Sequence, residues 1–209
     1  MSRAAEGSPA VQRSRSRAAA QVRSILAGAQ RLIEMKGDAF TVQELIQEAH
    51  VALPTFYRHF AGRDELLVAV IADQMVTACA RWEAAASDLD DPLERLRFYI
   101  GNTLETLGRD PLRDALARFV IVTHGRLRRV LPEELDQAEK PYVDLLRGAI
   151  QSAVYSGQLG TVDPEADAWF TAELVRSVYT HWAYASGDHS DVEDRLWEFC
   201  LRALGGWEK

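Results

Sequence analysis

A short segment of the chain, residues 53–60, combines aromatic and polar side chains. It reads Leu-Pro-Thr-Phe-Tyr-Arg-His-Phe, so a hydroxyl, a phenol, a guanidinium and an imidazole accompany two phenylalanines. A guanidinium can bind guanine through two hydrogen bonds, and Leu, Pro and the Thr methyl group can press against the methyl group of thymine. The remaining polar groups can bind phosphate oxygens, which fixes register on a duplex. The segment therefore predicts contact with double-stranded DNA.

Two short helices joined by a three-residue turn would position this segment. Thr41 stands three residues before Glu44, the spacing of a capping box, and predicts that a helix begins at Thr41. After the turn at residues 50–52, a second helix is expected from Leu53 to about Phe60. This arrangement is typical of a helix-turn-helix, whose second helix enters the major groove.

Helical periodicity extends along the rest of the sequence. A first helix is expected from residue 18 to Gly37, with one apolar face, and a long fourth helix over about 63–86. A capping Asp before Pro predicts further helix starts at Asp91, Asp110 and Asp163. A capping box predicts another at Ser190 with Glu193, and a Leu-Pro-Glu-Glu run predicts one at Leu131-Pro132. With no strand pattern, these signals predict an all-α fold of about nine helices.

Charge is distributed unevenly over the 209 residues, of which 47% are hydrophobic and 26% charged. Residues 1–70 hold nine basic and seven acidic side chains, a net charge of +2, whereas residues 71–209 hold 15 and 24, a net charge of -9. A basic N-terminal part suits a polyanionic partner. No long uncharged stretch or signal peptide is evident, so we expect a cytoplasmic protein with no membrane contact.

Residues 1–17 are expected to form a basic, flexible N-terminal arm. Arg13, Arg15 and Arg17 could enter a minor groove, as basic arms do in other DNA-binding modules. The alternative interpretation is a solvated tail without a DNA contact.

No pattern for catalysis or metal binding is present in the sequence. It has no Gly-rich phosphate loop, nucleophile elbow or clustered Cys and His ligands, which predicts no enzyme activity, no catalytic residue, no metal and no cofactor. Cys79 and Cys200 are expected to be buried thiols.

Residues 20–72 resemble the TetR/AcrR family of bacterial transcriptional regulators. The resemblance is carried by Phe40-Thr41-Val42, Glu44-Leu45-Ile46, Ala49, Val51, Thr55-Phe56-Tyr57-Arg58-His59-Phe60 and Arg63-Asp64-Glu65-Leu66-Leu67. It implies a three-helix DNA-binding domain over residues 18–72 and a larger helical domain for ligand binding and dimerisation over residues 73–209. The DNA contacts that it implies involve Thr41, Leu53, Pro54, Thr55, Tyr57, Arg58, His59 and Arg63.

Three residues depart from the family pattern. His50 stands in the turn where Gly is usual, and His is among the residues enriched at positive φ. Ala52 lacks the capping hydroxyl common there, which should cost about 0.5 to 2 kcal/mol of helix stability. Pro54 is tolerated because the first turn of a helix has no internal N–H bonds to lose.

Fourteen of the 18 aromatic residues follow residue 75. The resemblance implies an effector pocket, for which the sequence nominates Trp82, Phe98, Tyr99, Phe119, His124, Tyr142, Trp169, Tyr179, His181 and Trp182. The alternative is that these aromatics form ordinary core. Two C-terminal helices carry apolar stripes that are expected to form a dimer interface, through Phe170, Leu174, Val178, Leu196, Phe199 and Leu204.

These features together predict a homodimeric, ligand-responsive repressor that a small, largely apolar effector releases from a palindromic operator. Two-fold symmetry would place two reading helices about 34 to 36 Å apart, in successive major grooves. An activator of the same family is an alternative. A helical small-molecule carrier or enzyme without a DNA role is another.

Overall fold

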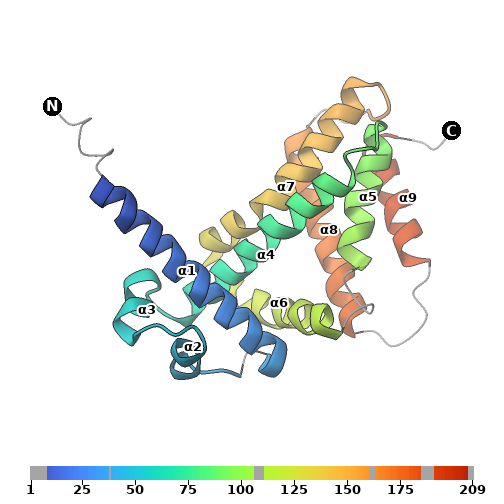
Figure 1. Cartoon of the computed structure of the whole chain (residues 1–209). Coiled ribbons are helices and arrows are strands. Elements are labelled where there is room, and N and C mark those ends of the chain that lie inside the picture. Colours follow the sequence, from blue (N-terminus) through green and yellow to red (C-terminus); the bar gives the residue numbers. More distant parts are fainter. Residues whose placement is uncertain (1–8, 38, 106–110, 161–162, 185–190, 207–209) are drawn as a thin grey trace.

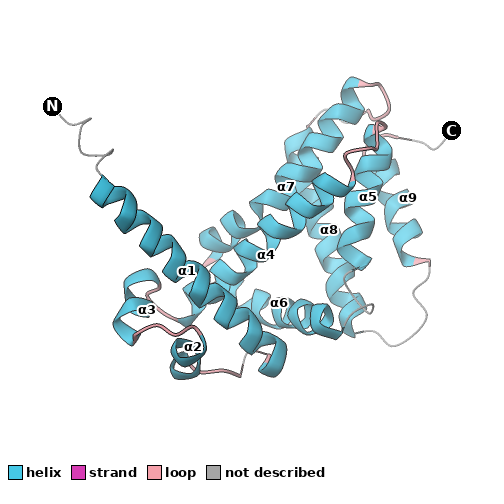
Figure 2. Ribbon diagram, viewed as in Figure 1, coloured by secondary structure: helices cyan, strands magenta, loops and turns pink. Residues whose placement is uncertain are grey.

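The computed structural model describes residues 9–37, 39–105, 111–160, 163–184 and 191–206. These residues form nine helices and no strand, which confirms the all-α prediction (Figures 1 and 2). In chain order the helices are α1 (Pro9–Lys36), α2 (Val42–Glu48), α3 (Leu53–His59), α4 (Arg63–Ala85), α5 (Pro92–Glu105), α6 (Pro111–Val130), α7 (Pro132–Tyr155), α8 (Pro164–Tyr184) and α9 (Val192–Ala203).

The N-terminal helices pack around one apolar core. It contains buried side chains of α1, α2, α3 and the first half of α4, among them Ile25, Leu45, Phe56 and Leu66. Gly28 lets α1 approach α2 closely, because a Cβ atom at this position would lie 3.1 Å from that of Ala49. This packing fixes the place of α3 at the lower left of Figure 1.

A second core lies among α4, α5, α7, α8 and α9. The long helix α4 belongs to both cores, since Ile71 is buried in the first and Trp82 in the second. Helix α6 also joins the two parts: its Phe119 and Leu127 are buried in the N-terminal core, although its sequence position is well inside the C-terminal part. The start of α7 contributes as well, through Leu135 and Ala138, so three helices link the helices around α3 to the rest of the chain.

The sequence predicted most helix starts correctly. Thr41 caps α2 through a complete capping box, and the carboxylates of Asp91 and Asp163 each accept a hydrogen bond from a backbone N–H of the first turn that follows. Gly37 and His50 have positive φ angles of 61° and 53°. Asp110 and Ser190 lie outside the described residues.

Three predictions of helix bounds need correction. Helix α1 begins at Pro9, nine residues earlier than expected, so the second half of the predicted flexible arm is helical. Helix α3 ends at His59, because Phe60 already has an extended backbone. The N-cap of α9 is Asp191, whose side chain makes no capping hydrogen bond.

Candidate nucleic-acid interface and pocket

Helix α2 is held at its start by a network around Glu44. The Thr41 hydroxyl accepts a hydrogen bond from the Glu44 backbone N–H (3.2 Å), and the Glu44 carboxylate accepts one from the Thr41 backbone N–H (2.8 Å). Lys36 donates a further hydrogen bond to Glu44 at 2.5 Å. Mainly because of the Lys36 bond, and then because of Thr41, the pKa of Glu44 is lowered to about 2. The Thr41 hydroxyl also donates to Glu44, so a phosphate at this residue would compete with that carboxylate.

Helix α3 is anchored by its two phenylalanines. Phe56 and Phe60 are buried, with ring centroids 5.7 Å apart, and the ring of Tyr57 meets Phe56 edge-on at 5.1 Å. Because these contacts hold one side of α3 against the core, the other side is free to face a ligand. Leu53, Pro54, Tyr57 and Arg58 are exposed on it, while Thr55 and His59 are half-buried. As expected, Ala52 provides no side-chain cap.

The side chain of Gln21, on α1, binds the two basic residues at the end of α3. Its Oε1 atom accepts a hydrogen bond from the Arg58 guanidinium at 2.8 Å and lies 3.3 Å from His59 Nε2. The sequence analysis missed Gln21, because nothing in the local pattern of an amphipathic helix marks one glutamine as facing another helix. The contact places the Arg58 guanidinium beside α1.

Arg63 is the first residue of α4. Its guanidinium carbon is 5.0 Å from the centroid of the Phe40 ring, a cation–π arrangement. The eight DNA-contact residues nominated from sequence therefore lie on α3 and on the N-terminal ends of α2 and α4, which is the arrangement of a helix-turn-helix.

Comparison with known proteins bears on what this arrangement does. Residues 25–70 match the family described as "Bacterial regulatory proteins, tetR family". The chain is also 24% identical over 177 residues to the HTH-type transcriptional repressor KstR of Mycolicibacterium smegmatis, covering 82% of this chain and 80% of that protein. The KstR protein of Mycobacterium tuberculosis is 24% identical over 174 residues, covering 81% and 73%.

Residues 25–70 of the chain are thus similar to the TetR family of bacterial regulators, and most of the chain is similar to the KstR repressors. The chain is a DNA-binding transcriptional regulator, and its relatives are regulators rather than enzymes. Solved structures of the same fold include RolR in complex with resorcinol (TM-score 0.75, 18% identity, 91% of this chain and 90% of that chain). Another is the regulator FadR from Bacillus subtilis in complex with stearoyl-CoA (TM-score 0.66, 18% identity, 89% and 99%). Among the described residues, no helix has both the length and the apolar character needed to cross a bilayer.

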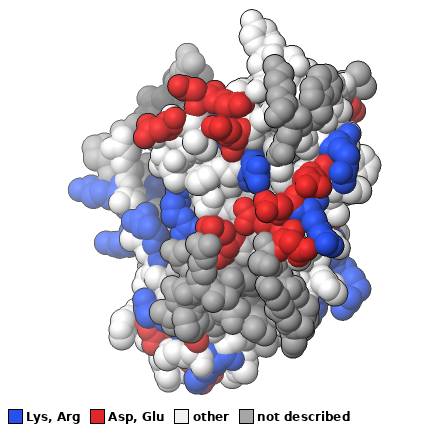
Figure 3. Space-filling model, turned by 90° about the vertical axis from the view of Figure 1, so that its right-hand side faces the viewer, with Lys and Arg blue, Asp and Glu red and all other residues white. Residues whose placement is uncertain are grey.

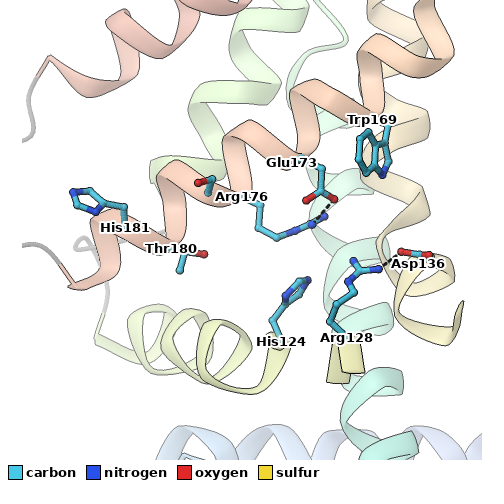
Figure 4. Close-up of a pocket in the computed structure, with 9 residues that line it drawn as sticks. His124, Arg128, Asp136, Trp169, Glu173, Arg176, Thr180 and His181 are labelled. Atoms are coloured by element: carbon cyan, nitrogen blue, oxygen red, sulfur yellow. Dashed lines mark hydrogen bonds and ion pairs between the residues drawn. The ribbon is translucent and has the colours of Figure 1, made fainter. Parts of the chain in front are cut away.

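A cavity of about 770 Å³ lies between α6, α7 and α8 of the C-terminal part (Figure 4). This volume is within the usual range for small-molecule sites. Most of the residues that line it carry a polar or charged group, although apolar atoms make up about as much of the surface: His124, Arg128, Asp136, Trp169, Glu173, Arg176, Ser177, Thr180 and His181. The cavity thus combines one large aromatic surface with several charged and hydrogen-bonding groups.

Buried Glu139 joins three of the basic groups at this cavity. It is only 7% exposed, and its carboxylate lies 2.9 Å from His124 Nε2, 2.7 Å from an Arg128 nitrogen and 3.0 Å from an Arg176 nitrogen. Arg128 also pairs with Asp136, and Arg176 pairs with Glu173 at 2.6 Å. Each guanidinium is therefore held between two carboxylates, which fixes its direction. The sequence analysis missed this group because the partners come from three different helices.

Only three of the nominated pocket residues line this cavity: His124, Trp169 and His181. Trp82, Tyr99 and Tyr142 are buried in the C-terminal core, and Phe119 is buried in the N-terminal core. Phe98, Tyr179 and Trp182 pack against the C-terminal core. Burial raises the pKa of Tyr142 well above the usual range. The aromatic residues therefore mostly stabilise the interior.

The nominated dimer residues divide into two groups. Phe170 and Phe199 are 62% and 55% exposed, so they are available to a second subunit. Leu196 and Leu204 are buried within this subunit, which corrects their assignment to an interface. Leu174 and Val178 are partly buried against the same core. The error arose because an apolar stripe on a helix does not show which neighbour it faces.

Proposed function

We propose that this regulator is a homodimeric repressor whose two α3 helices read a palindromic operator. The observation that carries the proposal is the exposed side of α3, where Leu53, Pro54, Tyr57 and Arg58 face away from the anchoring Phe56 and Phe60. Arg58 and Thr55 would contact base edges together with the two apolar residues. Tyr57, His59, Arg63 and Thr41 would hold phosphates. Residues 18–72 would form the DNA-binding domain and residues 73–209 the ligand-binding and dimerisation domain.

Exposed aromatic residues on α8 and α9 support dimerisation through these helices. Trp169 and Phe170 lie together on α8, with ring centroids 5.0 Å apart, and Phe199 is exposed on α9. Large exposed apolar side chains of this kind are typical of an interface. Acidic and basic side chains lie side by side across the middle of the face that is on the right in Figure 1, so a second subunit there would also meet charged groups (Figure 3).

Helix α6 supplies a physical link between the cavity and the DNA-binding helices. Its His124 and Arg128 line the cavity, its Leu127 is buried in the N-terminal core, and its Arg126 pairs with Asp64 in the first turn of α4. A ligand that favours another position of α6 would therefore favour another position of α4 and α3. The bound ligand would then weaken binding of the operator. By linkage, the bound operator would weaken binding of the ligand by the same factor.

The lining of the cavity favours an effector with hydrogen-bonding groups beside an aromatic or aliphatic part, in place of the largely apolar effector expected from the sequence. Trp169 can cover an apolar surface, while the Ser177, Thr180 and His181 side chains offer hydrogen bonds. RolR binds resorcinol and FadR binds stearoyl-CoA, so aromatic diols and acyl thioesters are suitable first compounds for a ligand screen.

The test is a mobility shift on operator fragments selected from genomic DNA, with wild type and Arg58→Ala. We expect a short palindromic site whose binding falls by roughly 10-fold to 100-fold in the variant, because a bidentate Arg–guanine contact contributes about 1 to 3 kcal/mol. Arg81→Ala is the matched control, since Arg81 is an exposed arginine on the half of α4 remote from α3. Equal binding by wild type and Arg58→Ala would refute the assignment of Arg58.

A further inference from the structure

The N-terminal third of α1 extends beyond the core that the rest of the helix packs on. α1 has 28 residues, about 42 Å at 1.5 Å per residue, yet its first buried side chain is Ile25. Residues 12–17 are all exposed. In Figure 1 this part of α1 projects past α3, away from the body of the molecule. We call residues 9–20 the α1 extension.

One side of the α1 extension is continuous with the basic end of α3. Gln21 must face α3, because it contacts both Arg58 and His59. At about 100° per residue, Arg17 lies about 40° from the direction of Gln21 and about 6 Å further along the helix. Arg13 lies about 80° from the direction of Gln21, rotated to the same side as Arg17, and about 12 Å further along the helix axis. Arg15 lies about 120° from the direction of Gln21, rotated to the other side. Arg13 and Arg17 therefore extend the basic surface of α3, and Arg15 does not.

The charges of the α1 extension also favour an anionic partner. The first turn of α1 contains no acidic residue, and no acidic residue occurs in α1 before Glu34. Cationic side chains close to a helix N-terminus oppose the helix dipole. A polyanion bound along this helix would compensate both the dipole and the arginine charges.

We propose that the α1 extension binds the DNA backbone as a helix, with Arg13 and Arg17 on phosphates beside the major groove that α3 enters. Gln21 then acts as a positioning residue that keeps the extension and the end of α3 in fixed register. This inference rests on the proposed reading of DNA by α3. It replaces the flexible minor-groove arm expected from the sequence, and it separates Arg13 and Arg17 from Arg15.

The salt dependence of binding tests the proposal directly. For duplex DNA the slope of log K against log salt changes by about 0.9 for each phosphate contact. We expect the double variant Arg13→Ala/Arg17→Ala to lower the slope by about 2, both on the operator and on an unrelated duplex of equal length. Arg15→Ala is the control: it removes one exposed arginine from the same stretch of α1 and should leave the slope unchanged. Alanine preserves the helix, which circular dichroism verifies.

The outcomes separate the inference from the proposed function. An unchanged slope in the double variant, with operator binding still sensitive to Arg58→Ala, overturns the α1 contact alone. A fall of about 0.9 for Arg15→Ala, which is the same fall per charge removed, would show unspecific charge attraction and also overturns it. An effect that disappears when A·T-rich flanks are replaced would indicate minor-groove insertion in place of phosphate binding. If wild type has no specific site while the double variant still lowers the slope on the unrelated duplex, the proposed function fails and the α1 contact stands.

Discussion

Replacing Glu139 by alanine should destabilise the C-terminal part strongly. The carboxylate is nearly buried, accepts a hydrogen bond from Arg128 and forms an ion pair with Arg176, with His124 also in contact. Breaking a buried ion pair by removing one partner costs about 3 to 5 kcal/mol. In the variant, Arg128 would keep Asp136 as a partner and Arg176 would keep Glu173. The side chains of Arg128 and Arg176 are also 32% and 22% exposed, so solvent reduces the cost of losing Glu139. We expect a loss of about 2 to 3 kcal/mol in the free energy of unfolding.

Urea unfolding at a fixed protein concentration measures this loss, since dimerisation would make stability depend on concentration. For a chain of this size the midpoint of thermal unfolding should fall by about 4 to 12 °C. Glu139→Gln keeps an oxygen acceptor and should lose less. Glu165→Ala is the surface control, because Glu165 pairs with Arg147 at 2.6 Å while its side chain is 69% exposed. A Glu139→Ala variant no less stable than Glu165→Ala would refute the assigned role of the buried carboxylate.

Two further predictions follow from shifted pKa values. Burial raises the pKa of the Cys79 thiol to about 12 and that of the Cys200 thiol to about 11. The native protein should therefore resist iodoacetamide at pH 8, whereas both thiols should become alkylated in urea. Mass spectrometry measures the difference. Rapid native labelling would contradict this. The lowered pKa of Glu44 means that its stabilising contribution is complete above about pH 4.5 and is lost as the pH falls toward about 2. The stability difference between wild type and Glu44→Gln should therefore shrink over that range, and a difference that grows on acidification would be inconsistent with the network around α2.

Local sequence signals predicted the helix-turn-helix because its structure is determined at short range. The Thr41–Glu44 capping box, the positive φ of His50 and the alternation of Phe56 and Phe60 with exposed residues all act within a few residues of the chain. The start of α1 was placed too late because Ser and Arg at residues 13–17 lack an apolar stripe, and α1 continues through them without core contacts.

The cavity and the interface could not be obtained in this way. Aromatic residues such as Trp82 and Tyr142 fit either a pocket or a core, and only the packing of α4 against α7 placed them inside. The group around Glu139 brings together residues of α6, α7 and α8, and the link from Arg126 to Asp64 spans 62 positions in the chain. Similarly, Leu196 belongs to the subunit's own core because α9 turns that side inward.

The sequence alone determined the all-α class and the position of the helix-turn-helix, because caps, turns and helical periodicity depend on neighbours a few residues apart. The tertiary structure decided which face of each helix is buried, where the cavity lies and which polar groups it holds, and how Gln21 meets Arg58. These features depend on contacts between helices distant in sequence, and the pattern along one helix does not state which neighbour its faces will meet.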